Sequence, residues 1–367
     1  MRRSLTNRVP SGQAQSGIVK VPGIERLRRS IQSIRDRFAT KALILLYHRV
    51  AELKSDPQLL SVRPQRFAKQ LEYLSRHYRV WSLKKLAQAI REEKCLPERV
   101  VAVTFDDGYA DNWLNAKPLL EAYDTPATVF VTSGYIGQNR EFWWDELEHL
   151  LLLPLELPES IAVTVNDKTF RWPLGRCRKH SSEKYKEYDT WDVTSSETPT
   201  PSHQAYRDLH GLLRPLGHHE QEKALAAMRS QIGCDGHARS GYRAMTAHEI
   251  RQLADTELVE VGAHSVTHPV FATQPLDVRW HELVDSKRQL EAILQRSVSS
   301  FAYPYGGPTD VGDTSVELTR DAGYEVACTT VPGPVTLASD CCFLPRCLVR
   351  DWDDNEFSFR LNRFFHG

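Results

Sequence analysis

The sequence lacks the features that mark several common classes of protein. Its 47 basic and 47 acidic residues give a formal net charge of zero, so no global positive field favours a nucleic-acid partner. Its seven cysteines show no CxxC spacing, which argues against a zinc ribbon, and their odd number argues against a complete disulfide framework. These features fit a reducing compartment, because at least one thiol would stay unpaired in an oxidising one.

Long apolar runs are also missing. The sequence contains no run of 18 or more apolar residues, the length that would indicate a transmembrane helix. The amino terminus carries basic residues but lacks the apolar segment of a secretory signal. We therefore expect a cytoplasmic protein. Its 367 residues are enough for one large α/β barrel or for two modest domains.

The most informative stretch is an apolar segment that ends in two carboxylates. Residues Val100–Phe105 read as a buried strand, and Asp106, Asp107 and Gly108 follow it directly. At a strand end the turn can bring both carboxylates together, and glycine lets the backbone approach a ligand closely. The alternative is an ordinary turn, since Asp-Gly is common at turns.

A second stretch favours a functional role for the two carboxylates over an ordinary turn. His264 and His268 lie four residues apart, just after the strand-like run Leu258–Val261. One carboxylate and two imidazoles make a three-ligand set for a divalent metal ion, with coordination positions left open. The other carboxylate of the Asp pair is then free to act as a base.

These segments resemble signature motifs of the polysaccharide deacetylases (carbohydrate esterase family 4, the NodB-homology domain). The motifs are Thr104–Gly108, His264–Pro269 and Phe301–Gly307, in the family's order. The resemblance spans roughly residues 42–364, with one poorly matching insertion. It implies an α/β fold, a distorted (β/α) barrel with fewer than eight strands.

The resemblance also implies roles for the motif residues. Asp107, His264 and His268 correspond to the metal ligands, and Asp106 to the catalytic base. A backbone N–H at Tyr305 corresponds to a donor for the oxyanion. Zinc is favoured by the resemblance and by the order of metal affinities, while cobalt, nickel, manganese and iron also suit this ligand set.

His48 is the expected general acid. It follows Tyr47 at the end of a strand-like run that begins at Ala42, and some branches of the family carry a Tyr-His pair near the amino terminus. The family's usual carboxy-terminal Leu-x-His motif is missing, because residues 327–331 read Ala-Cys-Thr-Thr-Val. A lone histidine at a strand end is otherwise more often structural.

The third motif departs from the family pattern. Ala302 stands where the family has an arginine that orients the catalytic aspartate, so Arg346 or Arg350 substitutes for it or Asp106 is oriented differently. Several residues are candidates for contact with substrate. They are Tyr109, Trp143, Trp144, Pro304, Arg346, Asp351 and Trp352. The two adjacent tryptophans are more often core residues than ligand contacts, although their rings could also stack on the apolar face of a sugar.

The domain boundaries follow from composition and pattern. Residues 1–40 form a polar tail and a basic amphipathic helix over 24–38, and residues 41–367 form the catalytic domain. We expect that helix to pack on the enzyme; the alternative is peripheral contact with an anionic, inner membrane surface. A mostly helical insertion covers about 140–243. Thr246 and Glu249 predict a capping box.

The predicted function is metal-dependent removal of N-acetyl groups from amino sugars of a glycan or lipid-linked glycan precursor, as in exopolysaccharide biosynthesis. One alternative is a C–N hydrolase acting on a non-sugar amide. Another is a non-catalytic carbohydrate-binding protein of the same fold, which the missing motif arginine would allow. The intact Asp-Asp-His-His set argues against it, because a binding module needs no spare base.

Overall fold

The computed structural model describes residues 40–154, 156–174, 188 and 190–366. The predicted basic helix at 24–38 lies outside these residues, so its packing and its membrane contact stay predictions. Within the described part of the chain, no helix is long and apolar enough to cross a membrane.

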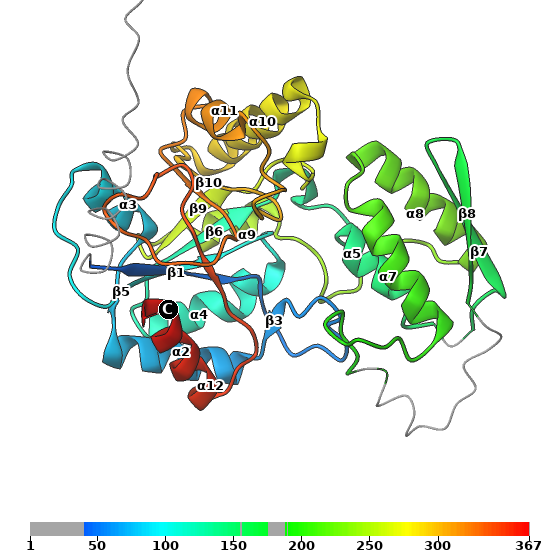
Figure 1. Ribbon diagram of the computed structural model, residues 1–367, viewed down its shortest axis with the longest axis horizontal. Coiled ribbons are helices and arrows are strands. Elements are labelled where there is room, and N and C mark those ends of the chain that lie inside the picture. Colours follow the sequence, from blue (N-terminus) through cyan, green and yellow to red (C-terminus); the bar gives the residue numbers. More distant parts are fainter. Residues whose placement is uncertain (1–39, 155, 175–187, 189, 367) are drawn as a thin grey trace, which may run out of the picture. The chain divides into compact units, whose positions relative to one another are not determined.

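The centre of the fold is a parallel sheet that curls into a half-barrel (Figure 1). Its strands, in spatial order, are β11 (Val326–Cys328), β10 (Ser300–Ala302), β9 (Val259–Ala263), β6 (Ala127–Val131), β5 (Val100–Phe105), β1 (Ala42–Tyr47) and β12 (Cys347–Leu348). A short strand, β4 (Arg79–Val80), also pairs with β5. The predicted distorted barrel is confirmed.

Alternation along the strands divides the apolar residues between two sides of the sheet. In β1, Leu43 and Leu45 join the cluster that includes residues of the surrounding helices, while Ala42 and Ile44 join a second cluster. That second cluster also takes residues from β5, β6, β10 and β11, as expected for the interior of a curled sheet. All six residues of β1 are buried, because both faces of a parallel sheet are covered.

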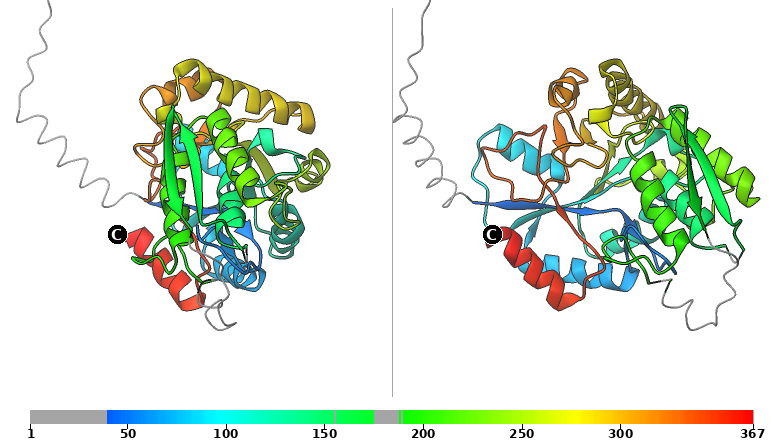
Figure 2. Two further views of the ribbon diagram at one scale, coloured as in Figure 1. Left: turned by 90° about the vertical axis from the view of Figure 1, so that its right-hand side faces the viewer. Right: turned by 45° about the vertical axis from the view of Figure 1, so that its right-hand side comes forward.

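Helices cover the outer side of the sheet (Figure 2). They are α2 (Pro64–His77), α4 (Lys117–Ala122), α9 (Ala247–Leu253), α10 (Leu276–Leu294), α11 (Ser315–Asp321) and α12 (Asp354–His366). A further helix, α3 (Leu83–Arg91), packs into the second cluster instead. The predicted capping box is confirmed at the start of α9. The Thr246 hydroxyl accepts a hydrogen bond from the Glu249 amide, and the Glu249 carboxylate accepts one from the Thr246 amide.

A separate group of elements follows β6. It contains α5 (Trp143–Leu151), the hairpin strands β7 (Ser160–Val165) and β8 (Lys168–Pro173), α7 (Pro201–Leu213) and α8 (His218–Ile232). These elements, coloured from teal to green in Figure 1, contribute most residues of one apolar cluster. An antiparallel bridge joins Glu141 to Arg243 where this segment leaves and rejoins the barrel. Arg239 ties the same place together by ion pairs with Glu141 and Glu148.

The carboxyl ends of the parallel strands carry the predicted site residues. Register pairs Tyr47 of β1 with Phe105 of β5, so His48 and Asp106 are the next residues on neighbouring strands. The His264 amide continues the pairing of β9 with β6 by donating to the Val131 carbonyl over 2.9 Å. Because parallel strands end at one edge of the sheet, motifs distant in sequence meet there.

Candidate active site

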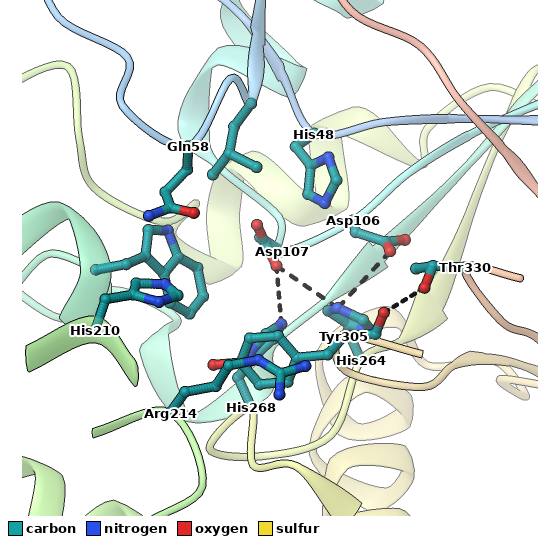
Figure 3. Close-up of a pocket in the computed structure, with 12 residues that line it drawn as sticks. His48, Gln58, Asp106, Asp107, His210, Arg214, His264, His268, Tyr305 and Thr330 are labelled. Carbon is teal, nitrogen blue, oxygen red and sulfur yellow. Dashed lines mark hydrogen bonds and ion pairs between the residues drawn. The ribbon is translucent and has the colours of Figure 1, made fainter. Parts of the chain in front are cut away.

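Three buried side chains form a group suited to one metal ion. Asp107, His264 and His268 each offer a ligand atom, and these atoms all lie within 4.8 Å of one another. The Asp107 Oδ1 atom is 3.6 Å from His264 Nε2 and 3.3 Å from His268 Nε2 (Figure 3). Asp107 and His268 both have positive φ, of 73° and 60°, which aspartate and histidine tolerate better than most residues.

The protonation states of Asp107 and His264 suit the binding of a cation. Burial lowers the pKa of His264 to about 4, so its imidazole is neutral at neutral pH. Its Nδ1 atom lies 2.7 Å from the Ala302 carbonyl oxygen and donates to it, which leaves Nε2 as the ligand atom. Burial alone would raise the pKa of Asp107, but the hydrogen bond and charge of His268 hold it at about 2. An ionised carboxylate and two imidazoles fit a divalent transition metal.

Asp106 is held by an arginine from the other end of the chain. Arg346 donates to both carboxylate oxygens, with Nη1–Oδ1 2.7 Å and Nη2–Oδ2 2.6 Å. The arginine side chain is 0% exposed and the aspartate 3%. Burial alone would raise the pKa of Asp106, but the charge and hydrogen bonds of Arg346, with the charge of His264, hold it below its usual value. Of the arginines considered from sequence, Arg346 makes this contact and Arg350 does not pair with Asp106.

His48 and Tyr305 flank the carboxylates. His48 lines the same pocket, half-buried, and its buried Nδ1 atom has no hydrogen-bond partner within the described part of the chain. Tyr305 has a positive φ of 59°, and its ring lies 4.7 Å from that of His268. No described residue accepts a hydrogen bond from the Tyr305 amide. This N–H therefore remains available as a donor.

The pocket over these groups has a volume of about 220 Å³. It is lined by His48, Gln58, Leu60, Asp106, Asp107, Trp144, His210, Arg214, His264, His268, Tyr305 and Thr330. His210 belongs to α7, and Arg214 follows that helix directly, so both come from the segment between β6 and α9. Sequence reasoning missed them because that segment matches no motif. The one signal that could have linked them is their spacing of four residues, which places both on one face of a helix.

The aromatic candidates form a buried layer beside the site. Tyr109 donates to Asp145 over 2.6 Å and accepts from Trp144 Nε1 over 2.9 Å. The Trp144 ring lies 4.8 Å from the His268 ring. Trp143 is buried and donates to the Tyr305 hydroxyl over 3.2 Å. Trp144 alone of these three lines the pocket. The packing alternative therefore fits Trp143, and Tyr109 is likewise buried without lining the pocket.

Four other substrate-contact predictions do not fit the geometry. Arg346 is fully buried and binds Asp106, Thr104 and the Thr329 carbonyl, so it holds Asp106 and does not face a ligand. Asp351 pairs with Arg63 on the surface, because the loop before α12 turns toward α2. Trp352 packs on the core beside Arg360. Pro304 is buried within its turn and does not line the pocket.

The imidazole of His210 makes stability depend on pH. Burial, with a smaller effect from Arg214, lowers its pKa to about 4, against about 6.5 in an unfolded chain. Between these values the unfolded state binds more protons, so stability falls as pH decreases from about 6.5 toward 4. From pH 7 to pH 5, the unfolding free energy of the native protein should fall by about 2 kcal/mol more than that of His210→Gln. Urea unfolding at both pH values measures this; equal decreases would contradict it.

Comparison with known proteins agrees with this site. The family model for polysaccharide deacetylase matches residues 93–156 and 229–327. The fold is a deacetylase-type (β/α) barrel, and the chain is similar to the polysaccharide deacetylase family over the matched residues, which make up less than half of it. The family match omits residues 157–228, which include α7.

Relatives and solved structures are similar over different lengths. The poly-beta-1,6-N-acetyl-D-glucosamine N-deacetylase of Escherichia coli (strain K12) is 34% identical over 82 residues, 22% of this chain and 12% of that protein. The enzyme of the same name from Staphylococcus epidermidis is 34% identical over 112 residues, 27% of this chain and 38% of that protein. The chain thus spans well under two thirds of these relatives.

Solved structures support the fold over most of the chain. The deacetylase PplD of Streptococcus pyogenes, in complex with acetate, superposes with a TM-score of 0.54 at 18% identity, over 88% of this chain and 98% of that one. IcaB from Ammonifex degensii gives a TM-score of 0.53 at 17% identity, over 89% of this chain and 98% of that one. At these identities the likeness extends to the fold alone.

Proposed function

We propose that this protein hydrolyses the N-acetyl group of an amino sugar in a glycan or lipid-linked glycan, with one divalent metal ion at Asp107, His264 and His268. The observation that carries the proposal is the buried carboxylate pair. Asp107 sits with two imidazoles, and Asp106 is held ionised beside them by Arg346. The names of the two curated relatives, both N-deacetylases of an N-acetylglucosamine polymer, support the substrate class.

The metal ion contributes one kind of chemistry. Bound by these three ligands, it would supply Lewis acidity at the acetamide carbonyl, and zinc is the ion we propose. The remaining tasks fall to side chains and backbone of this chain.

Proton transfer is divided between two residues on either side of the scissile bond. Asp106 accepts a proton from the attacking water, because its low pKa keeps it ionised and its carboxylate has lone pairs beyond those that Arg346 uses. The Tyr305 amide donates to the oxygen that becomes negative. His48, whose Nδ1 atom has no other partner among described residues, delivers a proton to the departing amine.

The direct test is acetate release from N-acetylglucosamine oligomers and from lipid-linked acetamido sugars, by zinc-reconstituted protein. We expect release by the native protein and a loss of about 10²–10⁴-fold in Asp106→Asn, the contribution typical of a general base. Metal content of the variant is measured in parallel and should stay near that of the native protein.

The outcomes separate the alternatives. No acetate from any acetamido sugar, with metal bound, would overturn the deacetylase proposal. Activity on an imide or ureide would then indicate an amide hydrolase of another class, and glycan binding without turnover would indicate a binding protein.

A further inference from the structure

Three residues in the wall of the pocket opposite His48 lie outside the residues that the family model matches. Figure 3 shows Gln58, His210 and Arg214 grouped on the side of Asp107 away from His48 and Asp106. His210 and Arg214 lie one helical turn apart and therefore present the same face of α7 and its end. Trp144 completes this wall with an aromatic ring.

Arg214 is held in place on two sides. Its Nη2 atom donates to Asp310 Oδ1 over 2.8 Å, and its Cζ atom lies 4.3 Å from the centroid of the Tyr305 ring. Asp310 also accepts from the Gly307 amide over 3.1 Å, so the carboxylate is fixed in the turn that follows Tyr305. A guanidinium fixed in this way loses little conformational entropy when it binds a ligand.

The rest of the guanidinium is available to a ligand. Its Nε and Nη1 atoms donate to no described residue, and the side chain is 33% exposed. Each of these N–H groups carries part of the guanidinium's positive charge and can donate a strong hydrogen bond to an oxygen of a carboxylate or a phosphate. The Tyr305 ring is close to both groups, with its centroid 4.3 Å from the guanidinium carbon of Arg214 and 4.7 Å from the centroid of the His268 imidazole. A ligand at the metal group is therefore within reach of Arg214 through a neighbouring substituent.

We propose that Arg214 binds an oxyanion, either a carboxylate or a phosphate, carried on or beside the acetamido sugar that is deacetylated; this rests on the function proposed above. The substrate class becomes an acidic glycan or a sugar phosphate. The same charge disfavours a neighbouring sugar that already carries a free, cationic amine, because like charges repel.

The test compares kcat/KM for acetate release from three substrates. N,N′-diacetylchitobiose is neutral, a disaccharide of glucuronate and N-acetylglucosamine carries a carboxylate, and N-acetylglucosamine 1-phosphate carries a phosphate. In Arg214→Gln, we expect a ten- to hundredfold loss on at least one acidic substrate, the worth of a hydrogen bond between charged groups. The loss should appear in KM and be at least tenfold larger than the loss on the neutral disaccharide. The two acidic substrates distinguish a carboxylate from a phosphate.

Arg140→Gln is the matched control. Arg140 pairs with Glu222 at 3.0 Å, lies 4.3 Å over the Tyr135 ring and is 25% exposed, but it does not line the pocket. This control should match the native protein on all three substrates. An equal loss on acidic and neutral substrates in Arg214→Gln would overturn the proposal, because it would show a general structural role.

Failure of the proposed function is a distinguishable result. If the native protein releases no acetate from any substrate, calorimetric binding of the two acidic sugars still tests Arg214. Binding that is lost in Arg214→Gln and kept in Arg140→Gln would support the oxyanion site without the deacetylase. No binding of either acidic sugar to the native protein would overturn it.

Discussion

Substitution of Arg346 by methionine is expected to lower the free energy of unfolding by about 3–5 kcal/mol, the cost of removing one partner of a buried ion pair. The substitution leaves Asp106 buried without its bidentate partner, whose charge and hydrogen bonds oppose the effect of burial on the pKa. The pKa of Asp106 then rises. A general base must be ionised, so the acidic limb of the kcat/KM profile should move to higher pH. At a fixed pH on that limb, kcat/KM should fall about tenfold for each unit by which the pKa of Asp106 rises.

Two further variants separate charge from packing. Arg346→Lys keeps the charge but cannot donate from two parallel N–H groups, so we expect partial losses of stability and rate. The double variant Arg346→Met with Asp106→Asn removes the unpaired charge and should regain part of the stability lost in Arg346→Met. Urea unfolding measures all of these. A change below about 1 kcal/mol in Arg346→Met would contradict a buried, structurally required pair.

Substitution of Asp107 by asparagine is expected to remove the metal ion. Changes in residues that only support metal ligands cost about 10–100-fold in affinity, so loss of the charged ligand itself should cost more. Asparagine has the same shape and tolerates the positive φ of 73° at this position, so the fold should be kept. The metal content after dialysis, by plasma mass spectrometry, should fall from about one ion per chain to near zero.

Thermal unfolding gives a readout independent of activity. A ligand that binds only the folded state raises its stability, by about 2.7 kcal/mol at a hundred times Kd. Zinc should therefore raise the Tm of the native protein and of Arg346→Met, but not that of Asp107→Asn. An Asp107→Asn protein that keeps one zinc ion per chain would contradict the assigned ligand set.

Local sequence was enough to predict many of the elements and most of the residues that the structure brings together in the candidate site. Val100–Phe105 is recognisable as a buried strand because both faces of a parallel sheet are covered, and its polar successors Asp106 and Asp107 must then lie at the sheet edge. The same argument applies to His48 after β1 and His264 after β9. Thr246 and Glu249 predicted a capping box because capping depends on residues only three apart.

Contacts between distant segments required the structure. Asp106 and Arg346 are 240 positions apart, and the sequence left Arg346, Arg350 and a different orientation of the aspartate open. Asp351 and Trp352 looked like groove residues because of their order in the chain, but the loop before α12 packs toward α2. Order along the chain does not set the direction in which a loop carries its side chains.

The sequence by itself determined the strands, their polar ends and the Asp-Asp-His-His group, because each depends on a pattern only a few residues long, and the barrel followed from the resemblance that these motifs carry. Tertiary structure alone decided which arginine holds Asp106 and which residues of the segment after β6 enter the pocket. The physical reason is that a long side chain such as Arg346 or Arg214 finds its partner through packing of elements that no local pattern relates.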